Sequence, residues 1–400
     1  MKKLMILGGS RYVLPVIRAA HALGIYVISC DYLPDNIAHR YSDDYVNVSI
    51  IDKDAVLHAA QKRKIDGIMS FACDPGVVTA AYVAEKMGLP SCGPYESVCI
   101  LQNKGRFRKF MAENGFNVPT ARCYTDISES VKDLDTFHWP VIVKPVDSAG
   151  SKGVSKVEDP EMLEEAAKHA LSYSRSGEFI IEDFIMQHGF SSDTDSFSVN
   201  GRLEFVSFNS QQFDARAENP YTPSAFSWPS SMTKNHQEEL ASEIQRLLRL
   251  LDMGTSIYNI ETREGTDGRA YIMECSPRGG GNRLAECLEY ATGLKLIENA
   301  VRAALDMPVI ELEQKPYDGY WAEVILHSNK DGIYKELWTD EAIQRCVIER
   351  DIWVKPGDKV KSFKAANFSI GTLIFRFARE EELKTVMKET EKYIKVILED

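Results

Sequence analysis

Two lysines stand where an ammonium group is expected to meet an anion. Lys144 lies inside the apolar run Val-Ile-Val-Lys-Pro, where an unpaired charge would be costly to bury. Its partner is either a carboxylate of the protein or a phosphate group of a nucleotide. Lys104 opens a helix that extends to about Asn114 and leads towards this strand. The pair therefore predicts an anion site, with Lys144 as its clearer member.

A loop of small residues, Asp147–Gly153, follows the Lys144 strand and is flanked by strands on both sides. Gly150 and Gly153 would let backbone amides approach phosphate oxygens closely, and Ser148 and Ser151 would add hydroxyl donors. The same residues suit the tip of a β-hairpin. The loop is thus consistent with phosphate binding without requiring it.

Two glutamates occupy strands that are predicted to pair as a hairpin, Thr255–Thr262 and Arg269–Cys275. In the expected register Glu261 and Glu274 lie side by side on one face, whereas a slip of one residue would separate them. Mg²⁺ in proteins is commonly bound by one or two carboxylates together with phosphate oxygens. If the two glutamates do not bind a metal ion, Glu261 would lie on a solvated face and Glu274 would form an ion pair with Arg278.

An arginine and three glycines follow the second of these strands, in the run Arg278-Gly-Gly-Gly-Asn-Arg283. A glycine turn before a helix favours anions, and Arg278 could bridge a transferring phosphoryl group. Farther upstream, Asp214–Met232 contains three prolines and shows no period, which predicts a long loop. Arg216 and Trp228 in that loop are candidate substrate contacts, although a surface excursion explains the composition equally well.

The elements around these residues suggest two kinds of architecture. The first hundred residues alternate short apolar strands with amphipathic helices, which predicts a parallel α/β sheet. The middle region reads as α+β and mainly antiparallel, and a third region begins at about Tyr317. Gly8-Gly9-Ser10 and Asp31 resemble parts of a dinucleotide site, but the complete G-x-G-x-x-G pattern is absent. A tight turn is the preferred explanation, and a nicotinamide-dependent dehydrogenase is a weak competitor.

Composition excludes several classes of partner. The net charge of −12 argues against nucleic acid and against anionic membranes, because both demand a basic surface. The eight cysteines are scattered, without zinc-site spacing, as is common in a reducing compartment. The apolar start ends at Gly8, too early for a signal peptide, and no later run could span a bilayer. We expect a cytoplasmic protein.

Taken in order, these motifs resemble those of the ATP-grasp superfamily. The resemblance rests on Asn103-Lys104, Val141–Gly153, Ile181-Glu-Asp-Phe184, Asn259-Ile-Glu261 and Glu274-Cys-Ser-Pro-Arg278, and covers about residues 1–310. It implies an ATP-grasp fold with a pre-grasp α/β domain at 1–102 and a grasp domain at 103–310. The ATP-binding subdomain would span about 120–190. Residues 311–400 resemble, more loosely, the closing C-terminal lid domain of the amino-acid ligase branch.

The resemblance also assigns roles to individual residues. Lys104 and Lys144 would contact the ATP phosphates beneath a lid formed by Asp147–Gly153, and Glu261 and Glu274 would bind the metal. Ser276 stands where the family usually has an asparagine ligand, and Asp193 is a candidate for the ribose-binding acid. Arg278 and Arg283 would face the substrate, with Arg278 and Lys144 catalytic. The remaining assignments form an adenine-binding hinge: Glu182, Asp183, Phe184 and Ile185.

The activity implied by the resemblance is a ligase that requires ATP and Mg²⁺ or Mn²⁺. It would activate a small carboxylate as an acylphosphate and join it to an amine, as L-amino-acid ligases do, and a homodimer is expected. One alternative is a bicarbonate-activating carboxylase or an enzyme of the carbamoyl-phosphate-synthetase type. Another, favoured by Ser276, is an ATP-binding regulator without turnover.

Overall fold

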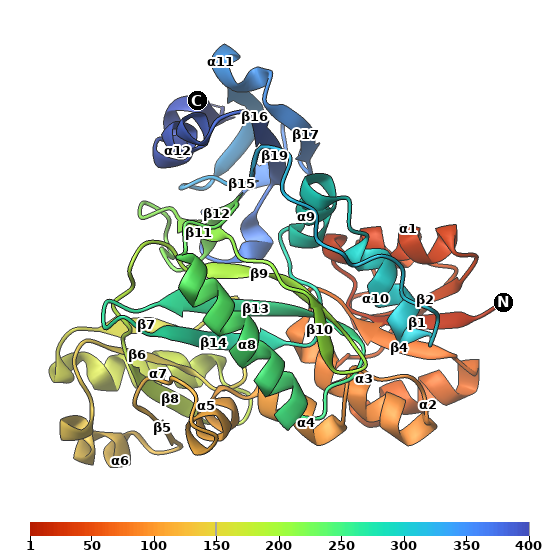
Figure 1. The fold of residues 1–400 in the computed structure, drawn as a ribbon, viewed down its shortest axis with the longest axis horizontal. Helices are drawn as coiled ribbons and strands as arrows, with labels where there is room; N and C mark the ends of the chain where they lie inside the picture. The colour runs from red at the N-terminus through yellow and green to blue at the C-terminus, as the bar shows by residue number, and fades with distance from the viewer. Residues whose placement is uncertain (149, 400) are drawn as a thin grey trace.

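The computed structural model describes residues 1–148 and 150–399. Its N-terminal region is a parallel sheet of order β3-β2-β1-β4 (Figure 1). The strands are β1 (Lys3–Leu7), β2 (Tyr26–Cys30), β3 (Asp44–Val46) and β4 (Gly67–Ser70). Leu7 pairs with both Cys30 and Ser70, so these strands end at one edge of the sheet. The segment that follows β4 therefore begins at this edge, facing the middle of the molecule.

Helices cover both faces of the N-terminal sheet. Leu4 and Ile6 pack on the side of α1 (Leu14–Ala22) and α10 (Leu296–Ala304). Met5 and Leu7 pack on the side of α2 (Lys53–Arg63) and α3 (Asp74–Met87). The two-residue period of a strand explains this division, because alternate side chains point to opposite faces. A helix that lies far away in sequence, α10, thus completes the first layer.

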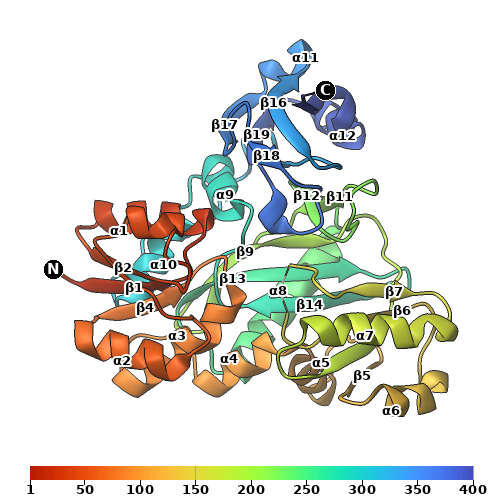
Figure 2. The same cartoon turned by 180° about the vertical axis from the view of Figure 1, so that it is seen from behind.

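A second, antiparallel sheet of order β5-β8-β6-β7 carries Lys144. Its strands are β5 (Ala121–Tyr124), β8 (Phe179–Asp183), β6 (Val141–Pro145) and β7 (Ser155–Val157). Val141 and Val143 face a core shared with α7 (Leu163–Tyr173), which Figure 2 shows along one side of the sheet. The alternate residues, including Lys144, project from the opposite face.

A third sheet, of order β10-β9-β13-β14, lies above the second in Figure 1. It contains β9 (Ser192–Val199), β10 (Arg202–Phe205), β13 (Ser256–Glu264) and β14 (Ala270–Ser276). Its core includes side chains of α4 (Tyr95–Gln102), α5 (Lys104–Glu113) and α8 (Lys234–Leu250). The helix that begins at Lys104 therefore rests against this sheet.

The C-terminal region shares a five-stranded sheet with the middle of the chain, in the order β11-β12-β15-β19-β17. A three-stranded sheet, β18-β16-β20, lies beside it. The strands are β11 (Ser210–Phe213), β12 (Pro223–Trp228), β15 (Tyr320–Leu326), β16 (Gly332–Thr339), β17 (Val347–Ile352), β18 (Lys359–Val360), β19 (Gly371–Phe377) and β20 (Ile394–Leu398). The remaining helices are α6 (Ile127–Lys132), α9 (Leu284–Thr292), α11 (Glu341–Gln344), α12 (Glu380–Lys388) and α13 (Thr390–Tyr393).

The mixed α/β and α+β class is confirmed, while two local predictions need correction. Residues 214–232 are not loop throughout, because β12 (Pro223–Trp228) pairs with β11 and β15. The alternation of residues 195–200 and 203–213 around Asn200-Gly201 predicts a hairpin, which is present, but its second arm ends at Phe205 and the next strand, β11, joins another sheet. Because β11 and β12 complete the C-terminal sheet, a boundary near residue 310 does not separate the sheets. In the described part of the chain, no helix has the length and apolar character to cross a membrane.

Candidate active site

The two glutamates predicted to be neighbours are paired directly across the third sheet. The register sets Glu261 of β13 opposite Glu274 of β14, which confirms the predicted alignment. Asp193 of β9 is opposite Glu261 on the other side. Cross-strand partners share a face, so three carboxylates form one row. Asp193, considered for a ribose contact, is therefore found beside the candidate metal ligands. Burial and the nearby Glu261 raise its pKa to about 8.

Lys104 is held at the start of α5 and points towards this row. Asn103 caps the helix by accepting a hydrogen bond from the Arg106 amide at 2.9 Å. The Lys104 ammonium lies 2.5 Å from Glu274 and donates to the Ser148 carbonyl at 3.1 Å. Burial opposes ionisation of Glu274, but Lys104 outweighs it and lowers the pKa of the carboxyl to about 2. The lysine and the glutamate are thus both charged.

Lys144 belongs to a buried three-residue cluster with Glu182 and Arg108. Its ammonium pairs with one oxygen of Glu182, and Arg108 Nε donates to the other at 3.0 Å. Arg108 also donates to the Met273 carbonyl at 2.8 Å, which links α5, β8 and β14. Although burial opposes ionisation, the two cations lower the pKa of Glu182 to about 2, whereas burial lowers the pKa of Lys144. Both oxygens of Glu182 are therefore occupied by the protein.

Sequence reasoning missed Arg108, although a signal existed. It lies within α5 beside Phe107 and is buried like Phe107 and Met111. An arginine on the apolar side of a helix needs a buried acid, for the same reason that Lys144 does.

Some residues of the predicted adenine hinge already form hydrogen bonds with other parts of the protein. Asp183 accepts hydrogen bonds from the backbone and the imidazole of His138, at 2.8 and 3.0 Å. The Phe184 amide donates to the Pro140 carbonyl at 3.0 Å. Among the described residues, the backbone amide and carbonyl of Ile185 make no hydrogen bond that adenine would have to displace. Among the described hinge residues, the backbone groups of Ile185 and the carbonyl of Phe184 are thus free to bind a base.

The predicted lid loop is anchored at both ends. The Asp147 carboxylate accepts from the amides of Arg175 and Ser176, at 3.1 and 2.8 Å. Ser151 Oγ donates to the Tyr221 carbonyl at 3.0 Å. Gly150 and Gly153 have φ of +68° and +72°, a region that side chains disfavour. Ala149, within the loop, lies outside the described residues. The loop therefore docks on the segment that precedes β12.

Arg278 is held by an acid from the N-terminal region, not by Glu274. Asp74, at the start of α3, accepts from Arg278 Nε and Nη2 at 2.8 Å each. Ser276 Oγ also donates to Asp74 at 2.8 Å, and Gln102 donates to Ser276 Oγ at 2.7 Å. Burial favours a neutral guanidine, but Asp74 overcomes it and the pKa of Arg278 is raised. Asp74 was not predicted, because nothing near it in sequence marks its partner.

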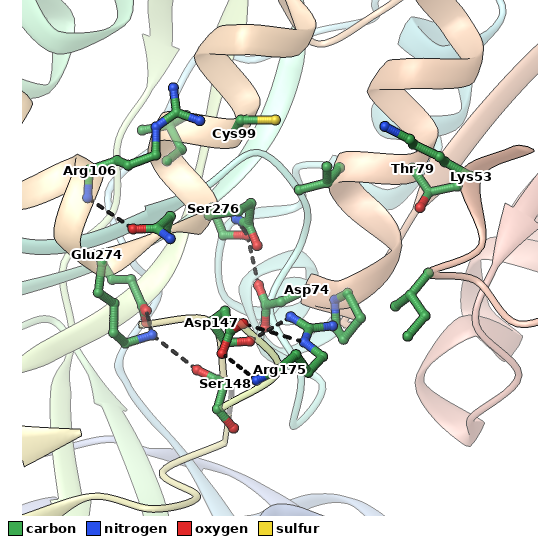
Figure 3. Close-up of a pocket in the computed structure, with 17 residues that line it drawn as sticks. Lys53, Asp74, Thr79, Cys99, Arg106, Asp147, Ser148, Arg175, Glu274 and Ser276 are labelled. Carbon is green, nitrogen blue, oxygen red and sulfur yellow. Dashed lines mark hydrogen bonds and ion pairs between the residues drawn. The ribbon is translucent and has the colours of Figure 1, made fainter. Parts of the chain in front are cut away.

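A cavity of about 410 Å³ opens beside these groups. Its lining joins Lys104, Glu274 and Ser276 to Asp74 and Thr79 of α3. Figure 3 shows the Glu274 end and the Lys53–Thr79 end on opposite sides of Asp74. The cavity thus runs from the row of carboxylates towards the N-terminal region.

None of the candidate substrate residues is among the described residues that line this cavity, although Arg278 is bonded to Asp74, which does line it. Arg216 pairs with Asp214 at 3.0 Å and its side chain is 58% exposed. Trp228 is completely buried and its indole donates to Ser207 Oγ at 3.1 Å, which is the behaviour of a core residue. Arg283 is buried in a separate group of acids at the base of the C-terminal region.

The arrangement can bind an anion and a divalent cation at the same place. Each cation that could meet a phosphate is now matched by a carboxylate: Lys104 by Glu274, Lys144 by Glu182 and Arg278 by Asp74. A phosphate that takes the ammonium of Lys104 frees Glu274 for a metal ion. The described residues contain no set of three or more His, Cys, Asp or Glu side chains able to hold a metal without such help. Mg²⁺ in proteins is commonly held in this way, by one or two carboxylates together with phosphate oxygens.

Comparison with known proteins places these groups in context. The model of the ATP-grasp domain matches residues 137–286. Formate-dependent phosphoribosylglycinamide formyltransferase of Synechococcus sp. (strain WH7803) is 30% identical over 187 residues, 46% of this chain and 48% of that protein. The enzyme of the same name from Parasynechococcus marenigrum (strain WH8102) is 24% identical over 362 residues, 89% of each chain. The crystal structure of L-amino acid ligase from Bacillus licheniformis has a TM-score of 0.82 at 19% identity and covers 100% of this chain and 99% of its own.

Proposed function

The chain belongs to the ATP-grasp superfamily, and from this premise we propose that it is an ADP-forming ligase that joins a carboxylate to an amine. The observation that carries the proposal is the convergence of Lys104, Lys144, Glu261 and Glu274, which come from four different elements. Two ammonium groups beside two aligned carboxylates are what a nucleoside triphosphate with its magnesium ion requires.

ATP and Mg²⁺ fit the residues present. Lys104 and Lys144 would bind phosphate oxygens, and Glu261 and Glu274 would hold the metal ion. Ser276 retains an oxygen lone pair beyond its bonds to Gln102 and Asp74, and can act as a third ligand. ATP supplies the phosphoryl group that activates the carboxylate, and Mg²⁺ neutralises the charge on its oxygens. The hinge would bind adenine chiefly through Ile185, because Glu182 and the Phe184 amide already have partners.

The protein groups contribute position and charge, not covalent chemistry. Arg278 is fixed by the two hydrogen bonds that it donates to Asp74, so its guanidinium stays charged and oriented without substrate. It can then stabilise the phosphoryl group during transfer to the carboxylate. The loop Asp147–Gly153, anchored on both sides of the site, would exclude water that hydrolyses an acylphosphate. The carboxylate substrate would enter through the 410 Å³ cavity beside Asp74.

The test is an ADP-release screen with the purified full chain. Small carboxylates and amino acids are offered singly and in pairs with ATP and Mg²⁺, and products are identified by mass spectrometry. We expect ADP release that requires both a carboxylate and an amine, and hydroxamate formation when hydroxylamine replaces the amine. Release that depends on bicarbonate alone would favour a carboxylase. ATP binding without ADP release across the whole panel would contradict the ligase proposal and favour a regulator.

A further inference from the structure

The five-stranded sheet buries a carboxyl group that has no partner. Glu323 lies in the middle of β15, is 0% exposed, and neither of its oxygens has a hydrogen bond among the described residues. Trp321 and Ile325, which share its face of the strand, belong to the same core as Leu284 and Leu288 of α9. Glu323 therefore points towards α9. A carboxyl in such surroundings is costly whether it is charged or neutral, because even its protonated form needs an acceptor.

The groups around Glu323 are also acidic. Arg283, which precedes α9, donates to Glu286 at 2.8 Å and to Glu349 at 2.7 Å, and lies 3.4 Å from Asp351. Glu323 of β15 and Glu349 of β17 both pair with Ile374 of β19, so the two carboxyl groups lie on the same face of the sheet. We call Arg283, Glu286, Glu323, Glu349 and Asp351 the acidic junction. Arg283 contacts three of these four carboxyl groups, whereas Glu323 has no ion pair or hydrogen bond among the described residues.

A second incompletely bonded acid links the junction to the Arg278 turn. Asp195 of β9 is 0% exposed, and its Oδ2 has no partner in the described residues. Its other oxygen accepts from the Gly280 amide at 2.8 Å. Gly280 lies against both Asp195 and Leu284, the first residue of α9, so Asp195 lies beside the start of this helix. Among the described residues, carboxyl oxygens without a partner are thus found both in the junction and beside the Arg278 turn.

The junction lies where three parts of the chain meet, and it reaches solvent. Figure 1 shows α9 between α1 and the strand β17. Tyr12, next to α1, donates to Asn282 at 3.1 Å and lies 3.3 Å from Ser369 Oγ. The side chains of Glu349 and Asp351 are 31% and 37% exposed, so the outer end of the junction meets solvent. A substrate that extends from Arg278 would approach this corner.

We propose that the acidic junction binds the ammonium group of an amine-bearing substrate, with Glu323 as its principal partner. The proposal rests on the ligase function above and narrows its substrates to those that carry a protonated primary amine. An ammonium has three N–H donors and matches the unpartnered oxygens of Glu323 and Asp195. A metal ion is a poorer occupant, since no set of three or more such ligands occurs in the described chain. Burial also raises the pKa of Glu323 well above its usual value, so a bound cation would favour its ionised form.

Binding of a simple cationic probe tests the site directly. Alaninamide carries the ammonium and no carboxylate, and N-acetylalaninamide is its neutral counterpart. Calorimetry should detect binding of alaninamide, but not of the acetylated compound, to the wild type and to the control variant Glu336→Gln. Glu336 is an exposed carboxyl on β16. Glu323→Gln should bind alaninamide at least about tenfold more weakly, because a charged hydrogen bond is lost. Equal affinity of Glu323→Gln and wild type, or equal binding of both compounds to wild type, would overturn the proposal.

Trapping with hydroxylamine separates the two possible sources of the ammonium. If it belongs to the nucleophile, Glu323→Gln keeps hydroxamate formation and loses amide formation at least about tenfold. If it belongs to the carboxylate substrate, both products decrease together. Unchanged amide and hydroxamate formation would reject the role of Glu323. Absence of hydroxamate in the wild type would instead reject the ligase function, while the alaninamide titration still decides the ammonium site. Unaltered ATP binding and circular dichroism of Glu323→Gln serve as the folding control.

Discussion

The nucleotide side of the proposed site and the acidic junction balance charge in opposite ways. On the nucleotide side Lys104, Lys144 and Arg278 each have a carboxylate partner. In the junction Arg283 contacts the carboxyl groups of Glu286, Glu349 and Asp351, and Glu323 has no hydrogen bond within the described chain. A ligand on the first side must replace internal partners, whereas a ligand in the junction must add positive charge. On the nucleotide side, phosphate and Mg²⁺ would replace ion pairs that the protein already makes. In the junction, the proposed ligand must carry a positive charge, and a neutral group would not serve in its place.

The largest expected effect is on turnover when the nucleotide side loses an acid. Glu274→Gln removes a metal ligand and the partner of Lys104, and should lower ADP release by about two to three orders of magnitude. Lys144→Ala should have a similar effect through loss of phosphate binding. Steady-state assays over a range of Mg²⁺ concentrations measure both, with Glu336→Gln as the control. Normal activity of Glu274→Gln and Lys144→Ala would remove the site assignment.

Next in size is the stability of the buried cluster that supports Lys144. Arg108→Met leaves Glu182 with one cation where it now has two, and should lower the free energy of unfolding by about 3 kcal/mol. Lys168→Met breaks only the exposed pair with Glu164 and should lower the free energy of unfolding far less. Urea titration followed by circular dichroism compares the two. Equal losses in both variants would show that the cluster is not strongly coupled to folding.

A smaller effect is expected where the N-terminal region orients the catalytic arginine. Asp74→Asn keeps the shape of the side chain but weakens its hold on Arg278, and should lower kcat about tenfold. The KM for ATP should change little, because Asp74 lies beyond the nucleotide contacts. A raised KM for ATP with an unaltered kcat would mean that Asp74 serves nucleotide binding and does not position Arg278.

The smallest effect concerns the pH dependence of the ligand-free protein. Burial raises the pKa of Asp195 to about 7, so the folded state binds its proton more tightly than the unfolded state does. Stability contributed by this group is therefore present below its usual pKa and is lost as pH rises from about 4 to about 7. Asp195→Asn should flatten this part of the profile and become more stable relative to wild type as pH rises. Denaturant titrations at several pH values would show parallel curves if Asp195 has no such role.

Apart from Arg108, residues with a local signal were predicted from sequence, and those whose partners lie far away were not. A lysine in an apolar strand and two glutamates in one hairpin can be recognised from sequence, because the residues that determine their burial and register are close neighbours in the chain. Asp74 and Arg278 are 204 positions apart, and only the fold brings them together. The burial of Glu323 likewise has no local signal, because α9, which covers it, lies far from β15 in the sequence. Trp228 was misjudged because prolines suggested a loop, while pairing with β15 places the residue in the core.

The most direct test of the central claim is a crystal structure with Mg²⁺ and a non-hydrolysable ATP analogue. We predict that the metal ion contacts Glu261 and Glu274, that the Lys104–Glu274 pair opens, and that Lys104 and Lys144 each reach a phosphate oxygen. A nucleotide bound elsewhere, or bound here with the Lys104–Glu274 pair intact and no metal on either glutamate, would contradict the account.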